Sequence, residues 1–238
     1  MNDKFLPLYR QIAEKIKQEI YNKNLQQGDA IPSEAKLTDK FNVSRVTIRQ
    51  AIDVLVNEDL LYKVQGSGTY VKKTRLEHNI YTLETFTEEA IRHNKVPVNK
   101  IIDFKITKPS DEIKVRLNLL DEDKVYFISR LRCIDNTPLV LEKTYLPIKL
   151  FPDLSYETML SSKYDYIENK KSLTIKQSHQ EIIPILPNEE LINLMSLKKD
   201  QPILHLVMDS ILDDGTVFEY TELYFKSDEY KFSLVAKR

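Results

Sequence analysis

The chain has 238 residues, of which 42% are hydrophobic, 30% are charged and only 4 are glycine, a composition that excludes a mainly disordered protein. No segment approaches the roughly 20 apolar residues of a membrane span, and the N-terminus lacks the apolar core of a secretion signal, so we expect a cytoplasmic protein. One cysteine, Cys133, and four scattered histidines exclude an internal disulfide framework and argue against a metal site or a bound cofactor.

The net charge of −1 conceals an uneven distribution along the chain. Residues 1–75 carry 13 Lys and Arg against 9 Asp and Glu, a net charge of +4. The remaining residues carry 22 against 27, a net charge of −5. A basic segment followed by an acidic one is a modest indication that the first segment binds a polyanion.

Three helices are predicted in the basic segment. Apolar residues at every fourth position predict an amphipathic helix over residues 7–23. Ser33 and Ser44 are capping residues, and they begin a second helix over 33–41 and a third helix over 44–58. Two short helices joined by a tight turn are typical of a helix-turn-helix motif.

The outward face of the third helix carries the candidate chemistry. Its polar side chains can contact base edges or phosphates in a DNA major groove. They are Arg45, Thr47, Arg49 and Gln50. The structural alternative for these residues is an ordinary solvated helix face.

A hairpin is predicted after the third helix, with strands over 61–64 and 69–72 and a tip that contains Gly66 and Gly68. Glycine permits the positive φ of a tight turn and allows the backbone to approach a phosphate closely. Either feature alone fits an inert hairpin, but three helices followed by a hairpin predict a winged helix-turn-helix.

The segments PSEAKLTDKFNVSRVTIRQAIDVLVNEDLL and QGSGTYV resemble the winged helix-turn-helix of the GntR family of bacterial transcription regulators. The resemblance implies a DNA-binding domain over residues 1–73. Family members commonly have an arginine where this chain has Ala35, and losing a bidentate guanine contact changes sequence preference by about 1–3 kcal/mol, so the family's operator sequence is not carried over. The DNA-binding residues expected from the motif and the resemblance are Ser33, Lys36, Ser44, Arg45, Thr47, Arg49, Gln50, Gly66, Ser67 and Gly68.

The acidic part of the chain contains an internal repeat. Residues 74–80 are polar and lack a clear period, so they are expected to link the first domain to a second one over 81–238. Within that domain, residues 110–145 align with residues 187–222. Each copy has a short amphipathic helix, an apolar strand, a turn and a return strand with a glutamate at the same place. Repeated units of this kind predict an α+β domain, an antiparallel sheet with helices packed on it and a pocket near the pseudo-twofold axis.

Two arginines are the first candidate anion ligands in this domain. Arg130 and Arg132 lie two apart on one predicted strand, so both point to the same face, where paired guanidinium groups suit a phosphate or a carboxylate. A compatible alternative is that they pair with Glu142, which a three-residue turn places opposite Arg130. Thr85 and Glu88 form a predicted capping box, and its helix N-terminus is either an anion site or simply a cap.

Four further runs, LETFTEEAIRHN, SRLRCIDNTPLVLEKTYLP, SSKYDYIE and DGTVFEYTELYF, resemble the UTRA effector domain of the HutC subfamily, which has a chorismate-lyase-like fold. From members that sense phosphorylated sugars, the resemblance implies phosphate contacts at Thr85, Phe86, Thr87, Arg130, Arg132, Ser162 and Tyr164. It implies sugar-hydroxyl contacts at Glu142 and Glu219. Phe225 stands where the amino-sugar-phosphate sensors have a tyrosine, so the resemblance does not specify the sugar.

These features together predict a bacterial transcription regulator. We expect a repressor that binds double-stranded operator DNA as a homodimer and releases it when a phosphorylated sugar binds the second domain. The alternatives are a regulator that senses another anion such as a carboxylate, a DNA-binding architectural protein, and a lyase-like enzyme. Against an enzyme, the sequence shows no nucleophile paired with a base and no histidine near the two arginines.

Overall fold

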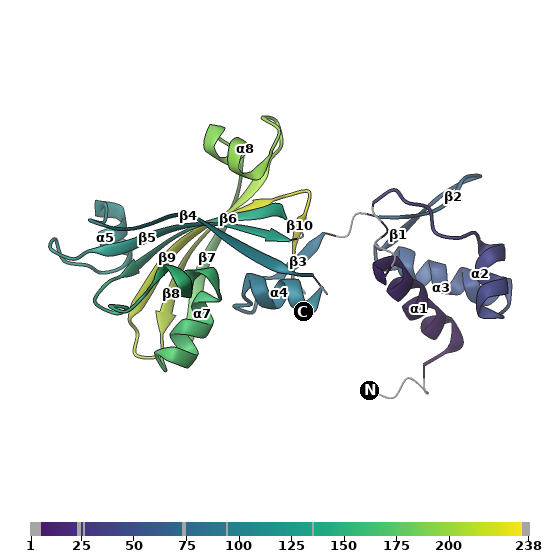
Figure 1. The fold of residues 1–238 in the computed structure, drawn as a ribbon, viewed down its shortest axis with the longest axis horizontal. Coiled ribbons are helices and arrows are strands. Elements are labelled where there is room, and N and C mark those ends of the chain that lie inside the picture. The colour runs from purple at the N-terminus through teal and green to yellow at the C-terminus, as the bar shows by residue number, and fades with distance from the viewer. Residues whose placement is uncertain are drawn as a thin grey trace. The chain divides into compact units, whose positions relative to one another are not determined.

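A computed structural model shows how the chain folds (Figure 1). The structure describes residues 6–22, 25, 27–72, 75–93, 95–134 and 136–234. The chain divides into two compact units, Met1–Thr74 and Arg75–Arg238. Within the described ranges, no helix is both long enough and apolar enough to cross a membrane.

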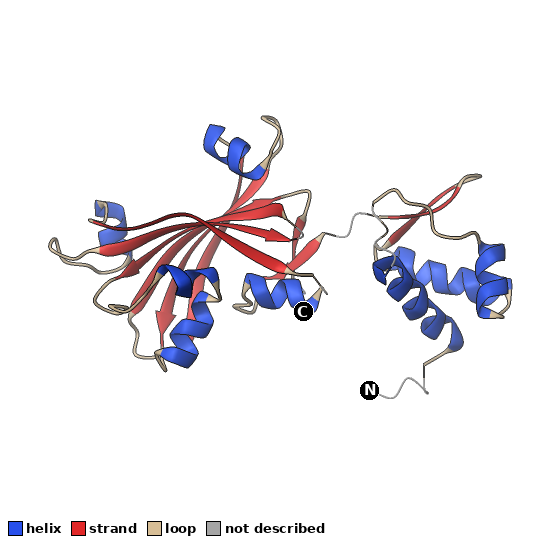
Figure 2. Cartoon of the chain, viewed as in Figure 1, coloured by secondary structure: helices blue, strands red, loops and turns tan. Residues whose placement is uncertain are grey.

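The first unit is a winged helix-turn-helix, as predicted (Figure 2). Ser33 and Ser44 cap the second and third helices by accepting the backbone N–H groups of Lys36 and Thr47. Apolar side chains from all three helices and both strands form one core, in which Leu55 is fully buried. The elements are α1 (Leu8–Asn22), α2 (Glu34–Phe41), α3 (Arg45–Asn57), β1 (Leu61–Val64) and β2 (Gly68–Val71).

The second unit is built on a six-stranded antiparallel sheet with the order β4-β5-β6-β9-β8-β7. This order is symmetric about the central β6–β9 pair, where Thr144 lies opposite Thr221. The α+β fold predicted from the repeat is confirmed, and the repeat includes one more strand before each copy. The strands are β4 (Pro97–Thr107), β5 (Val125–Ile134), β6 (Thr137–Pro147), β7 (Ile175–Ile185), β8 (Ile203–Leu212) and β9 (Val217–Lys226).

Helices cover both faces of this sheet (Figure 1). The repeated helices α5 (Asp111–Arg116) and α8 (Glu189–Met195) pack on one face, where their apolar side chains meet those of the central strands. The opposite face is covered by elements that are not part of the repeat. They are α4 (Phe86–Arg92), α6 (Tyr156–Leu160), α7 (Lys163–Asp165) and the π-helix η2 (Tyr166–Lys170).

The structure differs from the sequence expectation within residues 74–80, which contain a strand as well as connecting chain. β3 (Leu76–Asn79) pairs in parallel with β10 (Tyr230–Ser233), so it belongs to the second unit. Leu76 and His78 are buried on one side of this strand. A strand of four residues in which three are polar or charged offers too short a pattern to be recognised from the sequence.

Candidate functional site

The exposed face of α3 presents polar side chains at the beginning of the helix. Arg45, Arg49 and Gln50 are exposed. The Ser44 hydroxyl accepts the N–H of Thr47 at 3.2 Å and lies 2.9 Å from the Thr47 hydroxyl. The cap therefore holds two hydroxyl groups beside the arginines, in an arrangement suited to a nucleic-acid surface.

Arg49 is held by an acidic residue of α2. Its Nε donates to the Glu34 carboxylate at 3.0 Å, while its side chain remains 67% exposed. Exposed pairs of this kind contribute only about 0–1 kcal/mol, so a phosphate or a base edge can replace Glu34 at little cost. Ser33 and Lys36 are also exposed at the start of α2, where Ala35 leaves the position of the family's usual arginine without a long side chain.

The wing has a fully exposed tip. Gly66 and Gly68 both have positive φ, +75° and +150°. The N–H of Ser67 donates to the Val64 carbonyl at 3.0 Å, and this hydrogen bond closes the turn from Val64 to Ser67. The structure thus brings the predicted DNA-binding residues onto α2, α3 and the wing tip of one unit.

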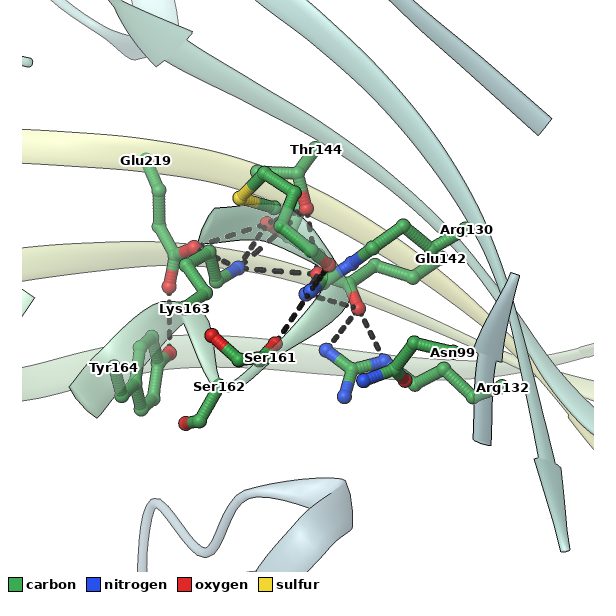
Figure 3. A network of polar contacts seen from close by, with 12 residues as sticks. Asn99, Arg130, Arg132, Glu142, Thr144, Ser161, Ser162, Lys163, Tyr164 and Glu219 are labelled. Atoms are coloured by element: carbon green, nitrogen blue, oxygen red, sulfur yellow. Dashed lines mark hydrogen bonds and ion pairs between the residues drawn. The ribbon is translucent and has the colours of Figure 1, made fainter. Parts of the chain in front are cut away.

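In the second unit, Lys163 lies between two buried carboxylates (Figure 3). Its Nζ is 3.2 Å from Glu142 and forms a shorter ion pair with Glu219. Glu142 and Glu219 occupy matching positions on β6 and β9, two residues before Thr144 and Thr221, whose hydroxyl oxygens are 3.0 Å apart. Lys163 therefore lies at the pseudo-twofold axis of the sheet.

Arg130 is fully buried and contacts Glu142 as well. Its Nη2 donates to both oxygens of Glu142 at 2.9 and 3.0 Å, and its Nη1 donates to the carbonyls of Met159 and Ser161. The predicted cross-strand pairing of Arg130 with Glu142 is confirmed. Burial lowers the pKa of Arg130 to about 10, so the group is charged at neutral pH. Its contacts make it a support for the loop between α6 and α7.

Arg132 is the guanidinium that reaches a pocket. Its Nε and Nη2 bind Glu142, and its guanidinium lies 5.5 Å from the ring centroid of Phe86. Its third nitrogen points away from Glu142 (Figure 3). Glu142 therefore fixes the orientation of Arg132 and leaves one side of the guanidinium for another acceptor.

The buried cluster carries an excess of positive charge. Its three cations are Arg130, Arg132 and Lys163, and its two carboxylates are Glu142 and Glu219. Burial alone would raise the pKa of Glu142, but the three cations hold it well below its ordinary value of 4.5. These five residues alone carry one excess positive charge, with Arg132 on the pocket side, while Glu89, paired with His78, and Glu84, paired with Arg92, also line the pocket.

The pocket lies on the face of the sheet that α4 and α7 cover. Seven of the predicted effector residues line it, namely Thr85, Phe86, Arg132, Glu142, Ser162, Tyr164 and Phe225. Thr87, Arg130 and Glu219 are not among its lining residues. Leu206, Met208 and Leu223 supply an apolar wall. A charged group and an apolar surface thus occupy different parts of one pocket.

The beginning of α4 forms a second polar part of the pocket. Thr85 and Glu88 make the predicted capping box, in which the Thr85 N–H donates to Glu88 at 2.7 Å. The N–H groups of Phe86 and Thr87 lie in the first turn, where a helix supplies no acceptor of its own. Phe86 lines the pocket and Thr87 does not, and the Glu88 carboxylate already accepts the Thr85 N–H at this end of the helix.

Sequence reasoning missed Lys163 and a buried histidine. His78 Nδ1 lies 2.6 Å from Glu89, which also accepts the Tyr230 hydroxyl at 3.1 Å. The expectation that no histidine lies near the arginines is wrong, because His78 and Arg132 line the same pocket. The one sequence feature that could have pointed to Lys163 is the matched pair of glutamates, because two buried carboxylates require a nearby cation.

Among the described residues, no cluster of His, Cys, Asp and Glu could hold a metal ion.

Comparisons with known proteins give two matches that together cover most of the chain. Residues 8–71 match the family described as bacterial regulatory proteins, gntR family, and residues 92–231 match the UTRA domain. The mannosyl-D-glycerate transport/metabolism system repressor MngR of Escherichia coli is 41% identical over 98% of this chain and 97% of its own length. The transcriptional repressor NagR of Bacillus subtilis is 33% identical over 95% and 93%. The crystal structure of PhnF from Mycobacterium smegmatis shares the fold, with a TM-score of 0.81 at 18% identity over 95% of this chain and 99% of that one.

Replacing Lys163 with methionine should destabilise the second unit by about 3–5 kcal/mol at pH 7, because it leaves the buried carboxylate of Glu219 without its cation. The free energy of unfolding, measured in urea, should recover when Glu219→Gln is added to Lys163→Met. Lys105→Met is the matched control, since Lys105 is exposed and its partner Asp103 is only partly buried, and should cost less than about 1 kcal/mol. Equal losses in Lys163→Met and Lys105→Met would contradict the assignment.

Glu142→Gln should change how stability depends on pH. The folded-state pKa of Glu142 is depressed, so its contribution is present above the ordinary pKa of 4.5 and is lost as the pH falls toward the lower folded-state value. The wild-type chain should therefore be more stable than Glu142→Gln at pH 7, and the difference should shrink steadily below about pH 4.5. A difference that stays constant between pH 7 and pH 3 would show that Glu142 is not held as an anion by its neighbours.

Proposed function

Because the chain belongs to the GntR family of bacterial regulatory proteins and carries their UTRA domain, we propose that it is a cytoplasmic homodimeric repressor released from operator DNA by a phosphorylated sugar. Membership of this family makes it a DNA-binding transcription regulator and not an enzyme. The single observation that carries the choice of effector is the Arg132 guanidinium, which Glu142 orients and which lines the pocket with one nitrogen directed away from Glu142.

The pocket offers a phosphate several donors of different kinds. Arg132, Ser162 and the residues Thr85 and Phe86 at the start of α4 line the same pocket. Charge-assisted hydrogen bonds of this type are roughly twice as strong as neutral ones. Arg130 and Glu219 act indirectly in this proposal, because they hold Glu142 and Lys163 in place.

The names of the relatives favour sugar derivatives. MngR is described as the repressor of a mannosyl-D-glycerate system. A glycerate group carries a carboxylate, so a sugar linked to a carboxylate is the second candidate effector. The apolar wall of Leu206, Met208 and Leu223 suits the carbon face of a sugar ring in either case.

The effector can change DNA affinity only by binding one arrangement of the protein better than another. α4 contributes to the pocket, and Glu89 on α4 is bonded to His78 on β3. β3 follows directly after the residues that join the two units in sequence. An effector that shifts α4 would therefore act on the strand nearest to the DNA-binding unit along the chain. Two recognition helices of a homodimer would contact half-sites about 34 Å apart.

A thermal-shift screen against sugar phosphates tests the effector class, with each unphosphorylated sugar as its control. A ligand at 100 times its Kd adds about 2.7 kcal/mol of stability, which raises the melting temperature measurably. We expect a shift that requires the phosphate, that is lost in Arg132→Met and that persists in the control Arg49→Ala, which changes an exposed arginine of the other unit. Equal shifts with phosphorylated and free sugars would contradict a phosphate site, and shifts with sugar carboxylates alone would favour the second candidate.

A further inference from the structure

An apolar side chain stands among the polar residues of the recognition surface. Val46 is 66% exposed, and it is the second residue of α3. Among the thirteen residues of α3, all of them described, it is the one large apolar side chain that is exposed, because Val54 and Val56 pack against the core. Neither burial nor helix propensity explains a valine here, since β-branched residues are poor helix formers.

Val46 is surrounded on the helix surface by exposed polar side chains. Arg49 and Gln50 lie three and four residues further along the helix, so they share a face with Val46. Arg45 precedes it and is exposed as well. Val46 therefore lies inside the proposed DNA-contact surface, at the end of the helix that enters a major groove in this type of motif.

The major groove offers one apolar feature to such a side chain, the C5-methyl group of thymine. All other groups on the base edges there are hydrogen-bond donors or acceptors, which a valine cannot satisfy. From this match we propose that Val46 is a specificity-determining residue that contacts a thymine methyl group in each half-site. The inference rests on the proposed DNA-binding function and adds a contact to it.

Ala35 increases the importance of a base contact by Val46 for sequence specificity. The start of α2 lacks the arginine that would contribute a bidentate contact to guanine, and Ala35 itself is exposed. Fewer base contacts from α2 leave more of the discrimination between sequences to the first turns of α3. Val46 then separates thymine from cytosine without any hydrogen bond.

The test begins with selection of high-affinity duplexes from a random-sequence library by the wild-type full-length chain. Each thymine of the selected half-site is then replaced by deoxyuridine, symmetrically in both half-sites, which removes only the methyl group. One replacement should weaken wild-type binding about three- to fivefold, the value of a buried methyl contact. The same replacement should leave the affinity of Val46→Ser unchanged.

Two controls separate this contact from other effects. Val115→Ser makes the same chemical change at an exposed position of α5 in the second unit, where Val115 is 81% exposed, and should retain the wild-type preference for thymine. The slope of log affinity against log salt concentration should be equal in wild type and Val46→Ser, since no phosphate contact is lost.

The outcomes are distinct. Wild-type affinity that is indifferent to every deoxyuridine replacement, or a thymine preference that survives in Val46→Ser, would overturn the role of Val46 while leaving DNA binding intact. A wild-type chain that enriches no sequence from the library would contradict the proposed function itself, and this inference with it.

Discussion

The ion pair between Lys163 and the carboxylates of Glu142 and Glu219 is the interaction on which the second unit depends. The internal repeat places one glutamate from each copy on the same face of the sheet, close to the axis between β6 and β9. Two buried carboxylates in such proximity are unfavourable unless cations accompany them. Lys163 comes from a segment outside the repeat, and it forms ion pairs with the glutamates of both copies at once.

The two copies then diverge in a way that creates a binding pocket. Arg130 lies opposite Glu142 on β5, whereas Ser210 lies opposite Glu219 at the matching place on β8. The first copy therefore supplies two guanidinium groups, and the second supplies small or apolar side chains such as Met208. The positive charge is concentrated on one side of the axis, where Arg132 meets the start of α4. A symmetric sheet thus acquires a polar end and an apolar end within one pocket.

Local chemistry made much of this architecture predictable. The serine caps at Ser33 and Ser44 fixed the beginnings of two helices, and the repeat identified the sheet. The pairing of Arg130 with Glu142 was predicted from a three-residue turn, but Thr137 already pairs with Ile134, and a register shift between Arg132 and Cys133 brings Arg130 opposite Glu142. Strand alternation predicts which face a side chain occupies, but not whether it ends at a pocket or behind it, so Arg130 was expected to contact the ligand and instead supports a loop.

The features that could not be predicted depend on contacts between distant segments. Lys163 lies 21 residues from Glu142 and 56 from Glu219, and no local pattern marks it as buried. β3 is defined by its pairing with β10 at the other end of the chain, and His78 is brought to the pocket only by that pairing. These positions are set by tertiary packing between distant segments, so the local sequence of a short polar segment does not predict them.

In the proposed function, an anion bound in the pocket of the second unit weakens the hold of the first unit on DNA. The most direct measurement is the affinity of the full-length chain for one selected operator duplex, by fluorescence anisotropy at fixed salt, with and without a saturating phosphorylated ligand. We predict a loss of affinity of about 5- to 150-fold with the phosphorylated ligand, the usual range of coupling between two sites, and none with its unphosphorylated form. An operator affinity that stays the same while the ligand is bound would contradict the account.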